Sequence, residues 1–483
     1  MPESLRAKTF RGVAWSAIDK ILVKIVQFAV NIIIARILMP EDYGIIGMIM
    51  VFITLSYLVI DSGFSQALVQ RLDRTQVDMS TAFYFNILVG VICYAILYLL
   101  SPLIASFYNL DILCSILRVI GLVVIFNSLC TVQRANLLIN IDFRTTAIIN
   151  ITAALISGIV GIILAQSGYG VWSLVSQTLV MQGISTFLLW IIGRWKPTLV
   201  FSLDSVKALW HFGSKLLFAG TVATIVREVN TIFIGRFYRA QELGYYHRAV
   251  QTTDIISTTM NDVINAVTFP VLSSVQDNNE RLVSIYSRML SMTAFCIFPV
   301  MALLAVIADP LVNLLLTDKW SPIVPLIRWL CIARVFTPIS ALNMNILNAI
   351  GRTDLYLKVD LSKIPLIIGI MALTLPISVR AVVIGNALSS FICYFINVYY
   401  PGKIFGFGVK KQFLIFSKTI LATLGMIVVA ILSMHIFSNN LLQILTVGAL
   451  SIISYVAFSF ILKSQEVDVI FNLAKNFVCK IKS

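Results

Sequence analysis

The residues Gly12–Leu38 read GVAWSAIDKILVKIVQFAVNIIIARIL. A helix of this length crosses a bilayer, because about 20 apolar residues rising 1.5 Å each span the ~30 Å hydrocarbon core. The stretch nevertheless carries Lys20, Lys24, Gln27 and Asn31, whose spacings of four, three and four residues place them on one helical face. A cation near the midplane costs roughly 2.5–3.5 kcal/mol on insertion scales, so we expect this face to meet protein or water rather than lipid.

A second copy of this pattern follows at a constant offset of 200 residues. The copies match at Ala35 and Gly235, Arg36 and Arg236, Asp42 and Glu242, and Gly44 and Gly244. At the same offset, the polar face reads Thr224, Arg227 and Thr231. Two spans with similar polar faces indicate two halves around one water-filled cavity.

The composition is that of an integral membrane protein. Of 483 residues, 59% are hydrophobic and 12% are charged, whereas soluble domains carry about 25% charged residues. The net charge of +14 would suggest nucleic acid as a partner in a soluble protein, but the membrane spans exclude a nucleic-acid-binding protein. We expect the lipid bilayer to be the protein's main surrounding.

Apolar windows of spanning length predict an all-α polytopic membrane protein with about 14 transmembrane helices. The windows are 13–38, 45–70, 80–105, 114–138, 146–166, 170–192, 208–235, 243–271, 284–308, 322–348, 355–376, 379–400, 412–436 and 440–462. Arg144-Thr145 and Arg352-Thr353 also match, at an offset of 208 residues. We therefore predict two pseudo-symmetric six-helix bundles, at 1–200 and 201–403, followed by two additional helices and a basic tail at 404–483.

Lysine and arginine residues in the connections predict the orientation. With the N-terminus in the cytoplasm, twenty-one of them lie on the cytoplasmic side, against Arg239, Lys319 and Arg380 outside. A missed span would scramble this alternation. Both termini are therefore predicted to be cytoplasmic. The excess of lysine and arginine over acidic residues mainly reflects the orientation of the protein in the membrane.

Motifs for catalysis and cofactor binding are missing from the sequence. There is no GxxxxGK[ST] loop, no HExxH motif among the three histidines and no CxxC pair among the seven cysteines. No outer connection exceeds about a dozen residues, which leaves little room for an extramembrane catalytic site. We predict a protein that is not an enzyme, with no cofactor, no metal and free thiols.

Cations and polar groups within the spans are the candidate substrate-binding residues. The cations are Lys20, Lys24, Arg227, Arg248 and Arg334, and the polar group comprises Gln27, Asn31, Thr231 and Gln251. They would line a cavity for an anion such as a phosphate or pyrophosphate, which arginine can bind through two parallel hydrogen bonds. The alternative is internal ion pairing: Asp19 with Lys20, Glu228 with a facing lysine, and Asp360 with Lys363.

The eighth window, 243–271, is the least apolar and carries a polar stripe. Gln251, Asp254, Thr258, Asn261 and Asn265 follow at spacings of three and four residues. Such a helix is expected to line water or to pack against other polar helices.

Three carboxylates are candidates for ion coupling: Asp61, Glu228 and Asp254. For Asp61, a structural hydrogen-bond anchor near Gly63 is the alternative.

Three segments resemble bacterial polysaccharide exporters. They are Gly12–Ser16 (GVAWS), Asp61–Arg71 (DSGFSQALVQR) and Asp318–Leu326 (DKWSPIVPL). Over essentially its whole length, the chain is similar to lipopolysaccharide and capsule flippases of the colanic acid exporter type. These form the polysaccharide transporter family of the multidrug/oligosaccharidyl-lipid/polysaccharide exporter superfamily.

The resemblance implies two six-helix lobes in a V, plus two helices, working by alternating access. The implied substrate is an undecaprenyl-pyrophosphate-linked oligosaccharide crossing the cell inner (cytoplasmic) membrane. A polysaccharide polymerase and chain-length machinery are the implied partners.

Two alternative functions remain open. A cation-coupled drug antiporter of the same superfamily should have acidic, aromatic binding surfaces, whereas the excess charge in these spans is basic. A membrane-embedded glycan polymerase or glycosyltransferase would need a large outer loop or a cluster of catalytic carboxylates, and the sequence has neither.

Overall fold

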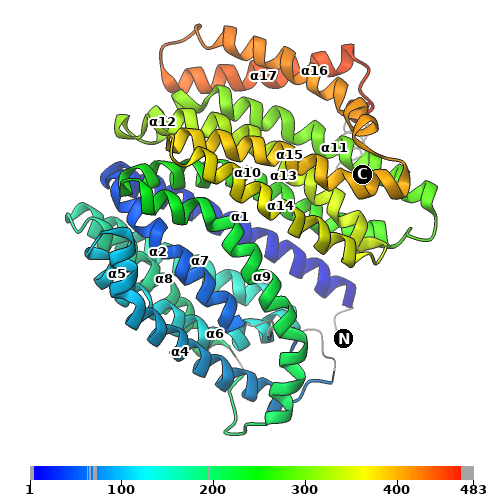
Figure 1. Ribbon diagram of the computed structural model, residues 1–483. Coiled ribbons are helices and arrows are strands. Elements are labelled where there is room, and N and C mark those ends of the chain that lie inside the picture. The colour runs from blue at the N-terminus through cyan, green and yellow to red at the C-terminus, as the bar shows by residue number, and fades with distance from the viewer. Residues whose placement is uncertain (1–4, 62–63, 65–66, 69–72, 194, 469–483) are drawn as a thin grey trace. The chain divides into compact units, whose positions relative to one another are not determined.

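The computed structural model describes residues 5–61, 64, 67–68, 73–193 and 195–468. Only the backbone is described at residues 5–14, 16–21, 208–209, 211–213, 215–216, 219, 266 and 269–270. Within these ranges, every regular element is a helix (Figure 1). The chain divides into two compact units, residues 1–244 and 245–483.

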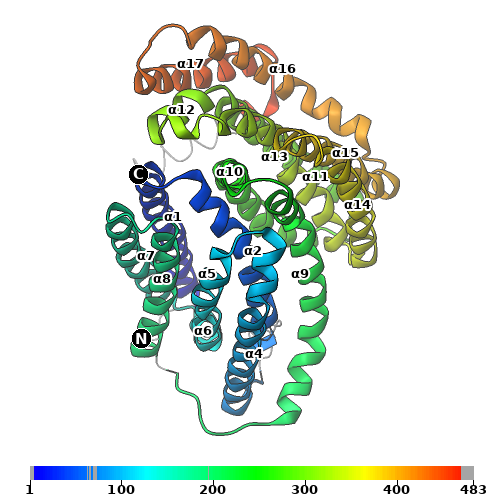
Figure 2. The ribbon, with the colours of Figure 1, turned by 60° about the vertical axis from the view of Figure 1, so that its left-hand side comes forward.

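Unit 1 contains eight helices over its described residues. They are α1 (Leu5–Ile37), α2 (Pro40–Asp61), α4 (Gln76–Tyr108), α5 (Ile112–Ile120), α6 (Leu122–Ile139), α7 (Phe143–Gln166), α8 (Val171–Ile192) and α9 (Leu203–Phe237). Helix α1 packs against α7, which packs against α8, and α6 lies between α4 and α8. Helix α9 packs along α2 and α4 (Figure 2).

Helix α10 (Ala240–Ser273) begins in unit 1 and passes into unit 2 at Tyr245. The other elements of unit 2 are α11 (Asn279–Val306), α12 (Ala308–Leu315), the 3-10 helix η1 (Asp318–Trp320), α13 (Ile323–Ala349), α14 (Thr353–Thr374), α15 (Val379–Phe405), α16 (Val409–Ser433) and α17 (Asn440–Ile461). Helix α13 packs against α11 and α15, and α14 packs against α15. Unit 1 has the same packing order. There, α6 packs against α4 and α8, as α13 packs against α11 and α15, and α7 packs against α8, as α14 packs against α15.

The repeat at an offset of 200 residues is visible in the helix boundaries. Helices α1 and α9 end at Ile37 and Phe237, and α2 and α10 begin at Pro40 and Ala240. Each pair therefore forms a helical hairpin with a two-residue connection. A proline at the first position of α2 suits this tight start, because its fixed φ is helical and its missing N–H leaves no orphan donor.

A helix overlaps each of the fourteen predicted windows. Of the helices in the described residues, ten spans are long and apolar enough to cross a membrane: α2, α4, α5 with α6, α7, α8, α11, α13, α15, α16 and α17. Helices α1, α9, α10 and α14 are not among these ten. The three-part division at residues 200 and 403 stays a prediction.

Helices α16 and α17 belong to unit 2 and lie side by side (Figure 1). Helix α16 also packs against α11, through a buried cluster of polar side chains. Gln412 Nε2 donates to Asn343 Oδ1 (2.8 Å) and to the Tyr286 hydroxyl (3.1 Å), and the Tyr394 hydroxyl donates to Gln412 Oε1 (3.1 Å). The four residues come from α11, α13, α15 and α16, so this polar cluster holds α16 in register.

The segment 195–202, which precedes α9, is hydrogen-bonded to the start of α4. The bonds are Trp195 Nε1 to Gln76 Oε1 (2.8 Å), Gln76 Nε2 to the Lys196 carbonyl (2.8 Å), Thr198 N to Ser80 Oγ (3.0 Å) and Ser202 N to Thr81 Oγ1 (3.1 Å). The Ser202 hydroxyl also caps α9 by accepting from Ser205 N. The first turn of α9 is thereby attached to unit 1.

Candidate functional site

The polar face predicted on α1 is partly described. Lys24 is exposed, and Gln27 and Asn31 are half-buried. Gln27 Nε2 lies 3.8 Å from the sulfur of Met181 on α8, so this face turns toward other helices of unit 1 at that level. The side chain of Lys20 lies outside the described residues.

On α9, the corresponding region contains a basic and an acidic residue next to each other in the sequence, Arg227 and Glu228. Arg227 Nε lies 3.3 Å from Glu228 Oε1, and the Thr231 hydroxyl donates to Glu228 Oε2 (3.3 Å). Arg227 is 65% exposed, whereas Thr224 and Thr231 are buried. Among the described side chains, Glu228 therefore pairs with its sequence neighbour Arg227, whereas the alternative interpretation gave it a facing lysine.

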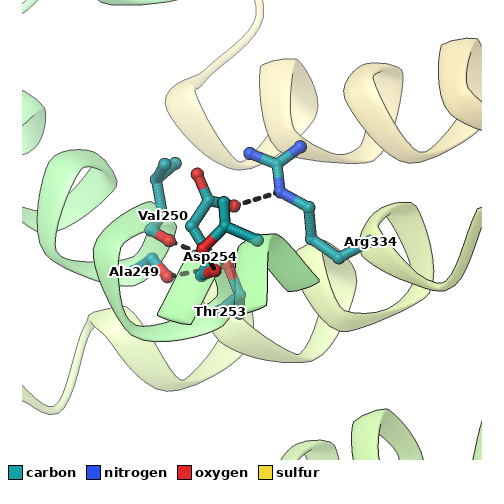
Figure 3. Close-up of polar contacts among 6 residues, drawn as sticks. Ala249, Val250, Thr253, Asp254 and Arg334 are labelled. Atoms are coloured by element: carbon teal, nitrogen blue, oxygen red, sulfur yellow. Dashed lines mark hydrogen bonds and ion pairs between the residues drawn. The ribbon is translucent and has the colours of Figure 1, made fainter. Parts of the chain in front are cut away.

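In unit 2, the polar stripe of α10 faces α13. The Arg334 guanidinium donates from Nε to Asp254 Oδ1 (Figure 3). Eleven residues further along both helices, Asn345 Nδ2 donates to Asn265 Oδ1 (2.8 Å). Eleven residues are about three helical turns, or roughly 16 Å. Because both contacts join residues 80 positions apart, α10 and α13 run in the same direction.

The Asp254–Arg334 ion pair is open to its surroundings on one side. The two side chains are 35% and 20% exposed, respectively. The neighbouring residue Thr253 is buried and donates its hydroxyl to the carbonyls of Ala249 and Val250 in its own helix (Figure 3). The carboxylate neutralises the guanidinium at a position where another anion could approach it.

Arg248 lies two turns before Asp254 on α10 and is 5% exposed. Its Nη1 donates to Gln251 Oε1 (2.8 Å), so two of the predicted site residues are direct partners.

Asp61 ends α2, and its Oδ1 is buried without a hydrogen-bond donor among the described residues. Gly63, the neighbour proposed to take part in an anchor, lies outside the described residues.

Internal ion pairing, the alternative interpretation, holds for one predicted pair. Lys363 Nζ lies 2.6 Å from Asp360 Oδ1 on α14. Asp19 and Lys20 lie outside the residues whose side chains are described. Carboxylate partners of Arg227, Arg334 and Lys363 lie within the described part of the chain.

The structure contains polar contacts that sequence reasoning missed. The partner of Asn265 is Asn345, which shares a face of α13 with Arg334 because eleven residues make three turns. That spacing was the available signal. The cluster around Gln412 had none, because the spacing of polar residues within one helix does not identify partners on three other helices.

Neither a metal site nor a disulfide is present in the described part of the chain. No three His, Cys, Asp or Glu residues gather closely enough to hold a metal ion there. The six cysteines that it includes are free.

Comparison with known proteins gives one family and several relatives. A family model described as "Polysaccharide biosynthesis protein" matches residues 33–325. The chain is 26% identical over 355 residues to the teichuronic acid biosynthesis protein TuaB of Bacillus subtilis (strain 168), covering 73% of each chain. It is 25% identical over 362 residues to the lipopolysaccharide biosynthesis protein WzxC of Escherichia coli (strain K12), covering 74% of each chain.

Among solved structures, the lipid II flippase MurJ in its inward closed conformation is similar to this chain. The TM-score is 0.72 at 18% sequence identity, covering 92% of this chain and 98% of MurJ. At this identity, the likeness is one of fold.

Proposed function

Because the chain belongs to the polysaccharide biosynthesis protein family, we propose that it is a flippase for a lipid-linked oligosaccharide. The match of the family model to residues 33–325 carries the proposal. The names of the relatives, which refer to teichuronic acid and lipopolysaccharide biosynthesis, support a glycan substrate. The chain is a multi-pass membrane protein without a catalytic motif, and its role in this proposal is transport rather than catalysis.

The substrate is an oligosaccharide on undecaprenyl pyrophosphate, and the membrane is the cell inner membrane. The protein crosses it about fourteen times with both termini in the cytoplasm, as two six-helix bundles and two further helices. Lys24, Arg227, Arg248 and Arg334 attract the pyrophosphate, and Gln27, Asn31, Thr231 and Gln251 meet sugar hydroxyls. A guanidinium suits this task because its planar fork matches two phosphate oxygens.

Asp254 acts as the resting counter-ion of Arg334 in this proposal. A pyrophosphate oxygen replaces the carboxylate on the guanidinium, so the site exchanges one ion pair for another. Such an exchange avoids an unpaired charge inside the membrane, which would be costly. The released carboxylate takes up a proton or a cation, and this uptake couples the ion gradient to transport.

The proposed cycle is alternating access, with the site open first to the cytoplasm and then to the outer face. Binding energy for the headgroup would shift the balance between the two states only if the two states differ in affinity for it. The polymerase that consumes the flipped repeat unit is the expected functional partner.

A deletion strain tests the function in the cell. Lipid-linked oligosaccharide should accumulate on the inner leaflet, and the wild-type gene should relieve the accumulation. The double variant Lys24→Glu, Arg227→Glu should insert normally and fail to relieve it. Arg380→Glu, an exposed charge reversal at the start of α15, is the matched control and should behave as wild type. Full complementation by the double variant would refute the role of these cations.

A further inference from the structure

In unit 1, an arginine of α5 stacks on a tyrosine of α4 where these two helices pack against each other (Figure 2). The central carbon of the Arg118 guanidinium lies 4.4 Å from the centroid of the Tyr98 ring. Arg118 Nε donates to the hydroxyl of Ser101 (2.9 Å), which is fully buried. The ring attracts the cation and the hydroxyl accepts one N–H group, so together they hold the guanidinium in one orientation.

Further contacts between α4 and α5 surround this stack. The Tyr94 hydroxyl donates to the backbone carbonyl of Arg118 (3.2 Å), and the Ser101 hydroxyl lies 3.3 Å from the sulfur of Cys114. Tyr94, Tyr98 and Ser101 follow at spacings of four and three residues, so they share the face of α4 that meets α5. The position of the arginine is therefore set by both helices.

The positive charge of Arg118 has no carboxylate partner in the described part of the chain. Its terminal nitrogens Nη1 and Nη2 likewise have no hydrogen-bond acceptor among the described residues. Helix α4, and α5 with α6, are both long and apolar enough to cross a membrane. Within such a span a guanidinium needs a counter-charge or water, because an unpaired buried charge is costly.

The surface beside the stack is apolar and exposed. Leu99 and Leu103 of α4 are 74% and 66% exposed, and Tyr98 is exposed as well. On a membrane span, an exposed apolar surface of this kind is suited to contact with lipid. Lipids carry their negative charge on the phosphate of the headgroup, so a lipid phosphate is the counter-charge available from this side.

The depth of Arg118 fits this counter-charge. The residue is the seventh of α5, roughly 9 Å along the helix from its start. In the predicted orientation, that start is on the outer side of the membrane. A long arginine side chain at this depth can extend toward the headgroups, whereas one at the bilayer centre cannot.

We propose that Arg118 and Tyr98 form a binding site for the phosphate of an anionic phospholipid. Two N–H groups at the free edge of the guanidinium bind two phosphate oxygens, and the acyl chains lie along the apolar surface of α4. An anionic headgroup is favoured over a zwitterionic one, because an ammonium group would bring a second positive charge close to the guanidinium. The site shares no residue with the cations of the proposed function and does not depend on that function.

Thermal unfolding of the full-length protein in detergent tests the site with phosphatidylglycerol as the probe. This lipid should raise the melting temperature of the wild type more than phosphatidylethanolamine does, since a ligand of the folded state stabilises it. Arg118→Gln should bind phosphatidylglycerol about tenfold more weakly, because hydrogen bonds to a charged group are lost, and should show a smaller rise. Each variant is compared with its own lipid-free melting temperature, so a change in stability alone does not alter the readout.

Arg380→Gln is the matched control, because it removes the same charge from an exposed position near the start of α15. It should keep the rise of the wild type. Inorganic phosphate separates a lipid from a free anion and should leave the melting temperature unchanged, because it has no acyl chains. A rise with inorganic phosphate as large as that with phosphatidylglycerol would overturn the lipid assignment. Equal rises in Arg118→Gln and the wild type, or an equal loss in Arg380→Gln, would overturn the site.

Native mass spectrometry then counts the phosphatidylglycerol molecules that stay bound. The wild type should retain one more than Arg118→Gln does, and equal numbers would contradict the site. Arg118→Lys decides the matter if Arg118→Gln does not fold. It should bind the lipid more weakly than the wild type, since an ammonium group lacks the planar pair of N–H groups, and wild-type binding would overturn the role of the guanidinium.

Discussion

At the residue scale, Asp254 and Arg334 hold opposite charges on α10 and α13, and both side chains are partly buried. The partly exposed carboxylate competes with any anion for the guanidinium. The two side chains are 35% and 20% exposed, so solvent weakens the attraction between their charges relative to a fully buried pair.

Asp254→Asn should therefore tighten the binding of an anionic headgroup and slow transport. The asparagine leaves Arg334 without a full counter-charge, and a gain of about 1 kcal/mol corresponds to roughly fivefold tighter binding. Binding of undecaprenyl pyrophosphate to the purified protein, measured by microscale thermophoresis, checks this. Arg334→Lys keeps the charge and should bind with wild-type affinity or somewhat more weakly. Weaker binding by Asp254→Asn would contradict the counter-ion role.

At the element scale, α16 is held to unit 2 by polar contacts inside an apolar bundle. Gln412 contributes its amide to Asn343, Tyr286 and Tyr394 at once. Hydrogen bonds between membrane helices contribute about 0.6 kcal/mol each on average, and loss of the amide leaves three polar partners buried.

Gln412→Leu should lower the free energy of unfolding by about 1–2 kcal/mol. The expected readout is a lower melting temperature in detergent. Ser417→Ala on the same helix is the control, because that exposed hydroxyl bonds only to the carbonyl of Leu414. Equal melting temperatures for Gln412→Leu and the wild type would show that the cluster does not stabilise α16.

The sequence predicted individual helices better than their contacts. Runs of about 20 apolar residues indicate a span directly, and the four- and three-residue spacings of Asp254, Thr258 and Asn261 indicated the polar stripe of α10. Spacing within one helix cannot identify a partner 80 residues away, so Arg334 and Asn345 were not assigned to that stripe.

At the scale of the whole molecule, the alternation of basic connections predicts the orientation. Leu199 precedes α9 on the predicted cytoplasmic side, and Tyr169 lies between α7 and α8 on the predicted outer side. Both side chains are well exposed.

A membrane-impermeant maleimide should label Tyr169→Cys in intact cells and Leu199→Cys only after the inner membrane is permeabilised. The parent protein with its native cysteines gives the background. Labelling of Leu199→Cys in intact cells would mean that the orientation is inverted or that a span has been miscounted.

Reconstitution is the most direct test of transport itself. Purified protein is placed in vesicles with undecaprenyl pyrophosphate that carries a sugar, and an external glycosidase reports the fraction of this lipid in the outer leaflet. Wild-type protein should make nearly all of the sugar accessible, whereas Lys24→Glu, Arg227→Glu should leave the accessible fraction at that of protein-free vesicles. Equal accessibility with and without wild-type protein would contradict the proposal that this chain is a flippase for lipid-linked oligosaccharides.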